Sequence, residues 1–167
     1  MPTFHPGLLQ QRQRGSAIVE FALIALIFFP VLIAIFEFGR LLYVYNTMQE
    51  VTRRGARAAV VRWIDQADAI KTLALFDATA MPAGAEVDAR NITIRYLKKD
   101  KSDVTALPVD PRDNMVACGT VAPRPDSCIA SVRVSIANVR YSVLGIPSTL
   151  IAVSDTMHAE SLGFDND

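Results

Sequence analysis

The sequence has few of the residues that build common catalytic and metal centres. Its 167 residues include only two histidines and two cysteines, so a histidine-rich zinc site and a four-cysteine metal site are both excluded. A Ser/His/Asp centre would need His5 or His158, and no neighbouring residues support either one. No glycine-rich phosphate-binding loop is present. We therefore expect no metal, no cofactor and no enzymatic activity.

The chain also lacks an excess of charge of either sign. Lysine plus arginine and aspartate plus glutamate both number 17, which argues against a nucleic-acid binder with a strong basic field. Apolar residues make up 51% of the chain. Many of them lie near the N-terminus, where the 16 residues from Phe21 to Phe36 carry no charge. They would form about 24 Å of helix, which is shorter than the hydrocarbon layer of a bilayer. A membrane span must therefore also use flanking residues, and we place it at residues 16–38.

Three interpretations of this apolar segment compete. A cleaved secretory signal needs small residues just after the apolar core, but residues 35–40 are IFEFGR. An uncleaved signal anchor fits the length but leaves Gly15 and Glu20 unexplained. Cleavage between Gly15 and Ser16, on the cytoplasmic side, would instead free an α-amine near Glu20. That amine could neutralise the Glu20 carboxylate, in the same subunit or a neighbour, whereas a lone carboxylate in lipid costs about 3 kcal/mol.

Three blocks of the sequence together resemble a known family. They are RGSAIVEFAL at residues 14–23, EFGRLLY at residues 37–43 and RGARAA at residues 54–59. Gly15, five residues before Glu20, together with the pair Glu20 and Phe21, resembles the processing site of type IV prepilins. The three blocks in this order are similar to the TadE-like proteins, which are pseudopilins or minor pilins of tight-adherence pilus systems.

This resemblance implies a minor pilin or pseudopilin that takes part in assembly of a tight-adherence type IV pilus and so in cell adhesion. A prepilin peptidase would cleave between Gly15 and Ser16, and Glu20 and Phe21 would act in assembly. Glu20 would be the counter-charge to the new N-terminus of a neighbouring subunit. The implied partners are the prepilin peptidase, other pilins or pseudopilins in a hetero-oligomer, and inner-membrane lipid, with no nucleic acid.

A second hypothesis is an uncleaved, single-pass membrane-anchored sensor or binding module with an exported domain. Under either hypothesis the N-terminus is cytoplasmic, because Arg12 and Arg14 precede the span and no acidic residue lies before Glu20. Arginines at positions 40, 53 and 54, which follow the span, would favour the opposite orientation. We give them less weight because a domain as long as the one that follows translocates largely regardless of charge. We expect a bacterial inner-membrane protein with a periplasmic C-terminal domain that can enter a surface pilus.

Beyond the span the helical pattern continues. Apolar or small residues recur at spacings of three and four, at Leu41, Val44, Met48, Val51, Gly55 and Ala58. This pattern predicts a helix that continues to about Ala74 or Leu75, with residues 39–76 as a spine beyond the membrane.

Small residues on this helix allow another backbone to approach closely. Gly39, Gly55 and Ala59 suit packing against neighbouring subunits, and they equally suit packing against the chain's own sheet. The sequence leaves both alternatives open. Glu50, four residues before Arg54, predicts an ordinary ion pair along the helix.

The pattern changes to period two in residues 77–167, the expected exported domain. Apolar and polar residues alternate in residues 92–96, 132–136 and 151–158, which predicts three strands with one buried face. The phase slips after Ile136, so we expect a bulge near Ala137 or Asn138. With residues 1–15 as a leader, the fold class is α+β and type IV pilin-like: a long N-terminal helix packed on a small antiparallel sheet.

Residues 98–127 contain charge clusters and four prolines, which predict a long irregular loop. Cys118 and Cys128 lie at its end, with nine residues between them. This spacing does not fit a CxxC redox pair, and two thiols without histidines make a poor zinc site. In an oxidising compartment we expect one disulfide.

Overall fold

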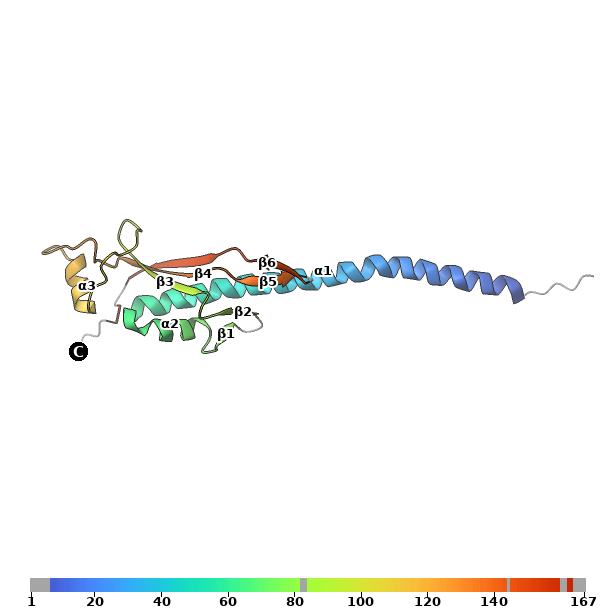
Figure 1. Cartoon of the computed structure of the whole chain (residues 1–167), viewed down its shortest axis with the longest axis horizontal. Helices are drawn as coiled ribbons and strands as arrows, with labels where there is room; N and C mark the ends of the chain where they lie inside the picture. Colours follow the sequence, from blue (N-terminus) through green and yellow to red (C-terminus); the bar gives the residue numbers. More distant parts are fainter. Residues whose placement is uncertain (1–6, 82–83, 144, 160–161, 164–167) are drawn as a thin grey trace, which may run out of the picture. The chain divides into compact units, whose positions relative to one another are not determined.

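The computed structural model describes residues 7–81, 84–143, 145–159 and 162–163 (Figure 1). The chain divides into two compact units, Met1–Leu42 and Tyr43–Asp167. Helix α1 (Gly7–Val61) belongs to both, because it forms the described part of the first unit and continues into the second. Residues 1–6 of the expected leader lie outside the described residues.

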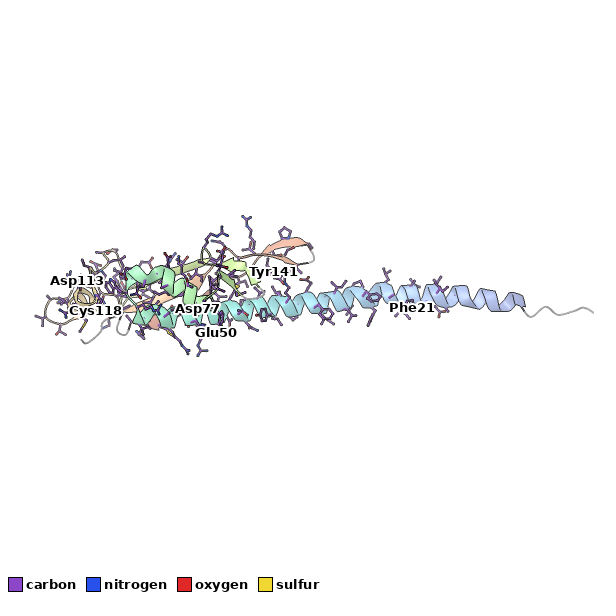
Figure 2. The ribbon with its side chains drawn as sticks, turned by 90° about the horizontal axis from the view of Figure 1, so that it is seen from below. Phe21, Glu50, Asp77, Asp113, Cys118 and Tyr141 are labelled. Carbon is purple, nitrogen blue, oxygen red and sulfur yellow. A yellow bond between two sulfur atoms is a disulfide. The ribbon has the colours of Figure 1, made fainter. Side chains whose placement is uncertain are left out.

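From Phe21 to Phe36, α1 carries no charged residue, and its large apolar side chains are exposed around the helix. Phe21 and Phe36 are 70% and 75% exposed, and Figure 2 shows Phe21 projecting from the helix. A helix that is apolar all round lacks the single stripe by which a soluble helix packs on a core. Within the described residues, Gly15–Val61 is long and apolar enough to cross a membrane. The helix continues through Pro30.

The second unit is built on a three-stranded antiparallel sheet with the order β3-β4-β7. Its strands are β3 (Ile92–Leu97), β4 (Ser131–Ile136) and β7 (Val153–His158). Val132, Val134 and Ile136 alternate along β4 and are fully buried, as are Val44 and Met48 of α1. The three predicted strands and the α+β layout are therefore confirmed, with the last strand beginning two residues later than expected.

The long helix ends earlier than the sequence pattern predicted. α1 stops at Val61, and a 3₁₀ turn η1 (Ile64–Gln66) and helix α2 (Ala67–Ala74) follow it. At the break, the backbone of Trp63 is extended. The amide of Leu162 donates to the Val60 carbonyl at 3.0 Å, and a Cβ on Gly163 would lie 3.0 Å from the Trp63 amide nitrogen. Residues 162–163, which are distant in sequence, thus bond to a carbonyl of the last turn of α1 and occupy the space beyond it. The prediction of one continuous helix to residue 75 is therefore wrong.

The phase slip after Ile136 marks a change of sheet rather than a bulge. β4 ends at Ile136, and Asn138 has a left-handed backbone with φ 58°, a conformation that asparagine tolerates better than most residues. The chain then forms β5 (Arg140–Val143), which pairs with β6 (Ile146–Thr149) instead of β3. A further antiparallel pair joins β1 (Ala80–Met81) and β2 (Gly84–Asp88).

The segment predicted as an irregular loop contains a short helix, α3 (Pro111–Cys118). The Asp110 side chain caps it by accepting a hydrogen bond from the Asp113 amide at 2.6 Å. Pro111 follows the cap, where its missing N–H costs nothing. An aspartate at the cap and a proline at the first helical position are a recognised start signal, so the sequence did contain the evidence for this helix.

Gly55 lies where α1, α2 and β4 meet. A Cβ there would lie 3.1 Å from Val134 Cγ1 and 3.3 Å from Ala74 Cβ. We predict that Gly55→Leu lowers the free energy of unfolding by about 1–3 kcal/mol, the usual cost of overpacking a core. Denaturant titration of the full chain in detergent micelles, followed by Trp63 fluorescence, measures this change.

Gly39→Leu is the matched control, because nothing lies within 4 Å of a Cβ at Gly39. Its unfolding midpoint should stay at the wild-type value or rise slightly, because leucine favours a helix more than glycine does. Equal midpoints for the two leucine variants would contradict the structural role of Gly55.

Candidate functional site

The expected processing site lies on the first part of α1. Gly15, Ser16 and Glu20 are exposed. The Ser16 hydroxyl donates to Glu20 Oε1 at 3.4 Å, because residues four apart share a helix face. The structure thus places the Glu20 carboxylate beside residue 16, within one chain.

This hydrogen bond does not neutralise Glu20. A hydroxyl carries no net charge, so a carboxylate at the lipid boundary still needs a cation. If a helix began at Ser16, its free α-amine would lie one turn from Glu20. The carboxylate would also lie near the positive end of the helix dipole, which attracts a negative charge. The arrangement can therefore hold an ion pair once the chain begins at residue 16.

The three small residues expected to pack against other subunits have different surroundings. Gly39 is exposed, and a Cβ at this position would meet no atom within 4 Å. Gly55 instead packs on Val134 of β4, and Ala59 is fully buried. For Gly55 and Ala59 the structure favours the alternative of packing within the chain's own fold, which covers both residues.

Among the ion pairs of the described residues, none joins Glu50 to Arg54, so the predicted pair is not formed. The Arg54 guanidinium lies 4.3 Å from the centroid of the Phe76 ring. Phe76 has a left-handed backbone with φ 60° just beyond α2. This cation–π contact joins the last turns of α1 to the end of α2.

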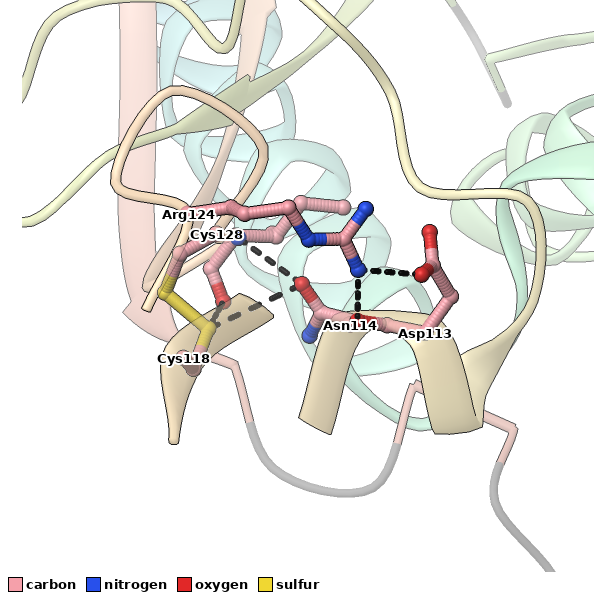
Figure 3. The surroundings of a disulfide bond; sticks show 6 residues. Asp113, Asn114, Cys118, Arg124 and Cys128 are labelled. Atoms are coloured by element: carbon pink, nitrogen blue, oxygen red, sulfur yellow. Dashed lines mark hydrogen bonds and ion pairs between the residues drawn. A yellow bond between two sulfur atoms is a disulfide. The ribbon is translucent and has the colours of Figure 1, made fainter. Parts of the chain in front are cut away.

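The predicted disulfide between Cys118 and Cys128 is formed. Figure 3 shows that it ties the end of α3 to the segment before β4. Next to it, the buried Asn114 accepts a hydrogen bond from the Ile129 amide at 2.9 Å. Arg124 pairs with Asp113, and its hydrogen bond is the main cause that lowers the pKa of the Asp113 carboxyl. Three bonds of different kinds thus fix α3 to residues 124–129, the segment that precedes β4.

The faces of α3 are reversed relative to an ordinary surface helix. Asn114 and Ala117 are its buried residues, whereas Met115 and Val116 are 57% and 53% exposed. Such helices normally turn their apolar side chains inward. The helix is therefore held by the polar Asn114 and by covalent and ionic bonds rather than by burial of its largest apolar side chains.

Comparison with known proteins gives one match. Residues 15–57 match the family model described as TadE-like protein, which confirms over this part of the chain the resemblance stated from the sequence. The matched residues all lie within α1, so the family match does not extend to the sheets, α2 or α3. No curated protein and no solved structure matches the chain.

We predict that replacing both cysteines, Cys118→Ser with Cys128→Ser, lowers the free energy of unfolding by about 2–3 kcal/mol, because the bridge restricts the unfolded chain. Denaturant titration of the oxidised full chain measures the loss. Wild-type protein treated with a reducing agent should unfold at the midpoint of the double variant. An unchanged midpoint in both samples would show that the bridge contributes nothing.

Proposed function

We propose that this chain is a minor pilin or pseudopilin that takes part in assembly of a tight-adherence type IV pilus. The observation that carries the proposal is the match of residues 15–57 to the TadE-like family, a family associated with such pili. The exposed apolar surface of α1 supports it, since a helix of this kind needs lipid or other helices around it.

The first step of the proposed function is cleavage between Gly15 and Ser16 by a prepilin peptidase. Glycine weakens a helix by about 1 kcal/mol relative to alanine, so the helix is locally easy to open at this position. Cleavage would leave the apolar helix in place and create an α-amine beside Glu20. The 3.4 Å contact between the side chains of Ser16 and Glu20 supports this geometry.

In the second step, Glu20 guides the subunit into the assembly. An unpaired carboxylate opposes burial among apolar helices, whereas a carboxylate that meets an ammonium group is tolerated and fixes the register. We assign this partner to the α-amine of a neighbouring pilin or pseudopilin, while the chain's own α-amine can serve before docking. Phe21, which is exposed next to Glu20, and Gly39, with open space around it, are also accessible to such neighbours.

The proposed location is the bacterial inner membrane, with the N-terminus in the cytoplasm and the second unit in the periplasm. The arginines before the span support this orientation. The disulfide supports it independently, because disulfides persist in the periplasm and are rare in the cytosol. Incorporation into a surface pilus would keep the second unit in an oxidising environment.

Mass spectrometry of the membrane-extracted protein tests the processing step. In cells that contain the prepilin peptidase, we predict a mature N-terminus at Ser16, and we predict that Gly15→Leu retains the leader because the enlarged side chain no longer fits a site for glycine. Wild-type protein that keeps Met1 or Pro2 while the peptidase is active would contradict the proposal. It would favour an uncleaved, membrane-anchored sensor or binding module.

Replacement of Glu20 tests the assembly step. Glu20→Gln keeps the size of the side chain but removes its charge, so we predict normal cleavage and at least tenfold fewer assembled pili, counted by electron microscopy. Glu50→Gln is the matched control, since it removes an exposed carboxylate of α1 outside the span. Normal pilus numbers with Glu20→Gln would rule out the counter-charge role.

A further inference from the structure

A hollow with a basic lining lies beside the turn that follows β3. It has a volume of about 470 Å³, and its lining includes Lys98, Lys99, Lys101, Ser131, Thr156 and His158. Among the described residues that line it, none is acidic. We propose that this hollow binds a small oxyanion, through phosphate or carboxylate oxygens. The proposal does not depend on the pilus function.

Backbone hydrogen bonds define the turn, and one of its lysines, Lys101, has a strained backbone. The Lys101 amide donates to the Lys98 carbonyl at 3.0 Å, and the Lys98 amide donates to the Ser102 carbonyl at 2.8 Å. Lys101 has a left-handed backbone with φ 67°, which is uncommon for a residue other than glycine, asparagine or aspartate. Strain of this kind concentrates at functional sites, and here it sets a lysine at the edge of a cavity.

Two acidic residues at or near the turn are already engaged. Asp100 accepts hydrogen bonds from the Ser102 amide at 3.0 Å and the Ser102 hydroxyl at 2.6 Å. Asp126 pairs with Lys98 at 3.1 Å. Among the ion pairs of the described residues, none includes Lys99 or Lys101. These two ammonium groups are therefore the cations available to a ligand.

The strands add further positive charge next to the hollow. Arg133 Nε donates to Thr156 Oγ1 at 3.1 Å, so one arginine is fixed to a residue that lines the hollow. Arg133 also lies directly opposite Arg95 in the register of β3 and β4, and Asp103, 3.7 Å from Arg95, offsets part of this charge. Like charges in opposed positions destabilise a sheet, and an anion nearby would relieve the repulsion that is left.

The size and chemistry of the hollow suit a small ligand. Small-molecule sites usually have volumes of about 300–1,000 Å³. Ammonium groups make strong charge-assisted hydrogen bonds to phosphate and carboxylate oxygens, and the hydroxyls of Ser131 and Thr156 supply neutral donors. The oxyanion could come from a soluble molecule or from a lipid headgroup, since both present the same oxygens.

Calorimetric titration of the full chain tests the proposal. In nanodiscs of neutral phosphatidylcholine at low salt, we expect saturable binding of inorganic pyrophosphate and of citrate, with an affinity that falls as salt rises. The variant Lys99→Gln with Lys101→Asn should bind at least tenfold more weakly. Asparagine is chosen because it tolerates the left-handed backbone, so the turn is kept while the charge is removed.

Lys71→Gln is the matched control, since it removes one positive charge on α2, outside the lining of the hollow. It should leave both affinities unchanged. Absence of saturable binding by the wild type, or equal affinity of the wild type and the double variant, would overturn the proposal.

Nanodiscs that contain phosphatidylglycerol distinguish the two sources of the anion. If anionic headgroups occupy the hollow, they should weaken pyrophosphate binding by the wild type at least tenfold. In the double variant, the same lipids should have no such effect on pyrophosphate binding. If the natural ligand is soluble, the affinity for pyrophosphate should be the same in both lipid mixtures once the salt concentration is matched. Either result supports an oxyanion site and identifies its source.

Discussion

The second unit depends on the close approach of α1 to β4 at Gly55. Val134 and Ala74 lie where a larger residue's side chain would begin, so the helix, the central strand and α2 meet at one position. β4 in turn pairs with both β3 and β7. The missing side chain of Gly55 therefore lets the helix lie close to the sheet, and Val134 of β4 occupies part of the space that this leaves.

Features set by local periodicity could be predicted from the sequence. The apolar run and the spacing from Leu41 to Ala58 predicted α1, and strict alternation predicted β3, β4 and most of β7. The proposed processing site is also local, since Ser16 and Glu20 are one helical turn apart. The disulfide followed from the number of cysteines and the expected compartment, with no need to know the fold.

Features set by distant contacts could not be predicted in the same way. The break after Val61 is stabilised by Leu162 and Gly163, which lie about a hundred residues further along the chain. Periodicity identifies the inner stripe of a helix but not what covers it, so Gly55 was compatible with a neighbouring subunit as well as with β4. The basic hollow combines a turn after β3 with residues of β4 and β7, and no sequence spacing brings these together. The helix α3 is different, because its capping signal was present but lay within a stretch rich in charge and proline.

The burial of small residues has a consequence for any neighbour that lies along α1 beyond Leu42. Between Tyr43 and Val61, the side chains left exposed on the helix include Glu50, Arg53 and Arg57, whereas Gly55 and Ala59 are covered. A copy or partner lying along this stretch meets long charged side chains, whose attraction is screened over about 8–10 Å at physiological ionic strength. Contacts between helices within lipid have no such screening. A neighbour's contacts with the apolar part of α1 would thus be insensitive to salt concentration. Its contacts with the charged part would weaken as the salt concentration rises.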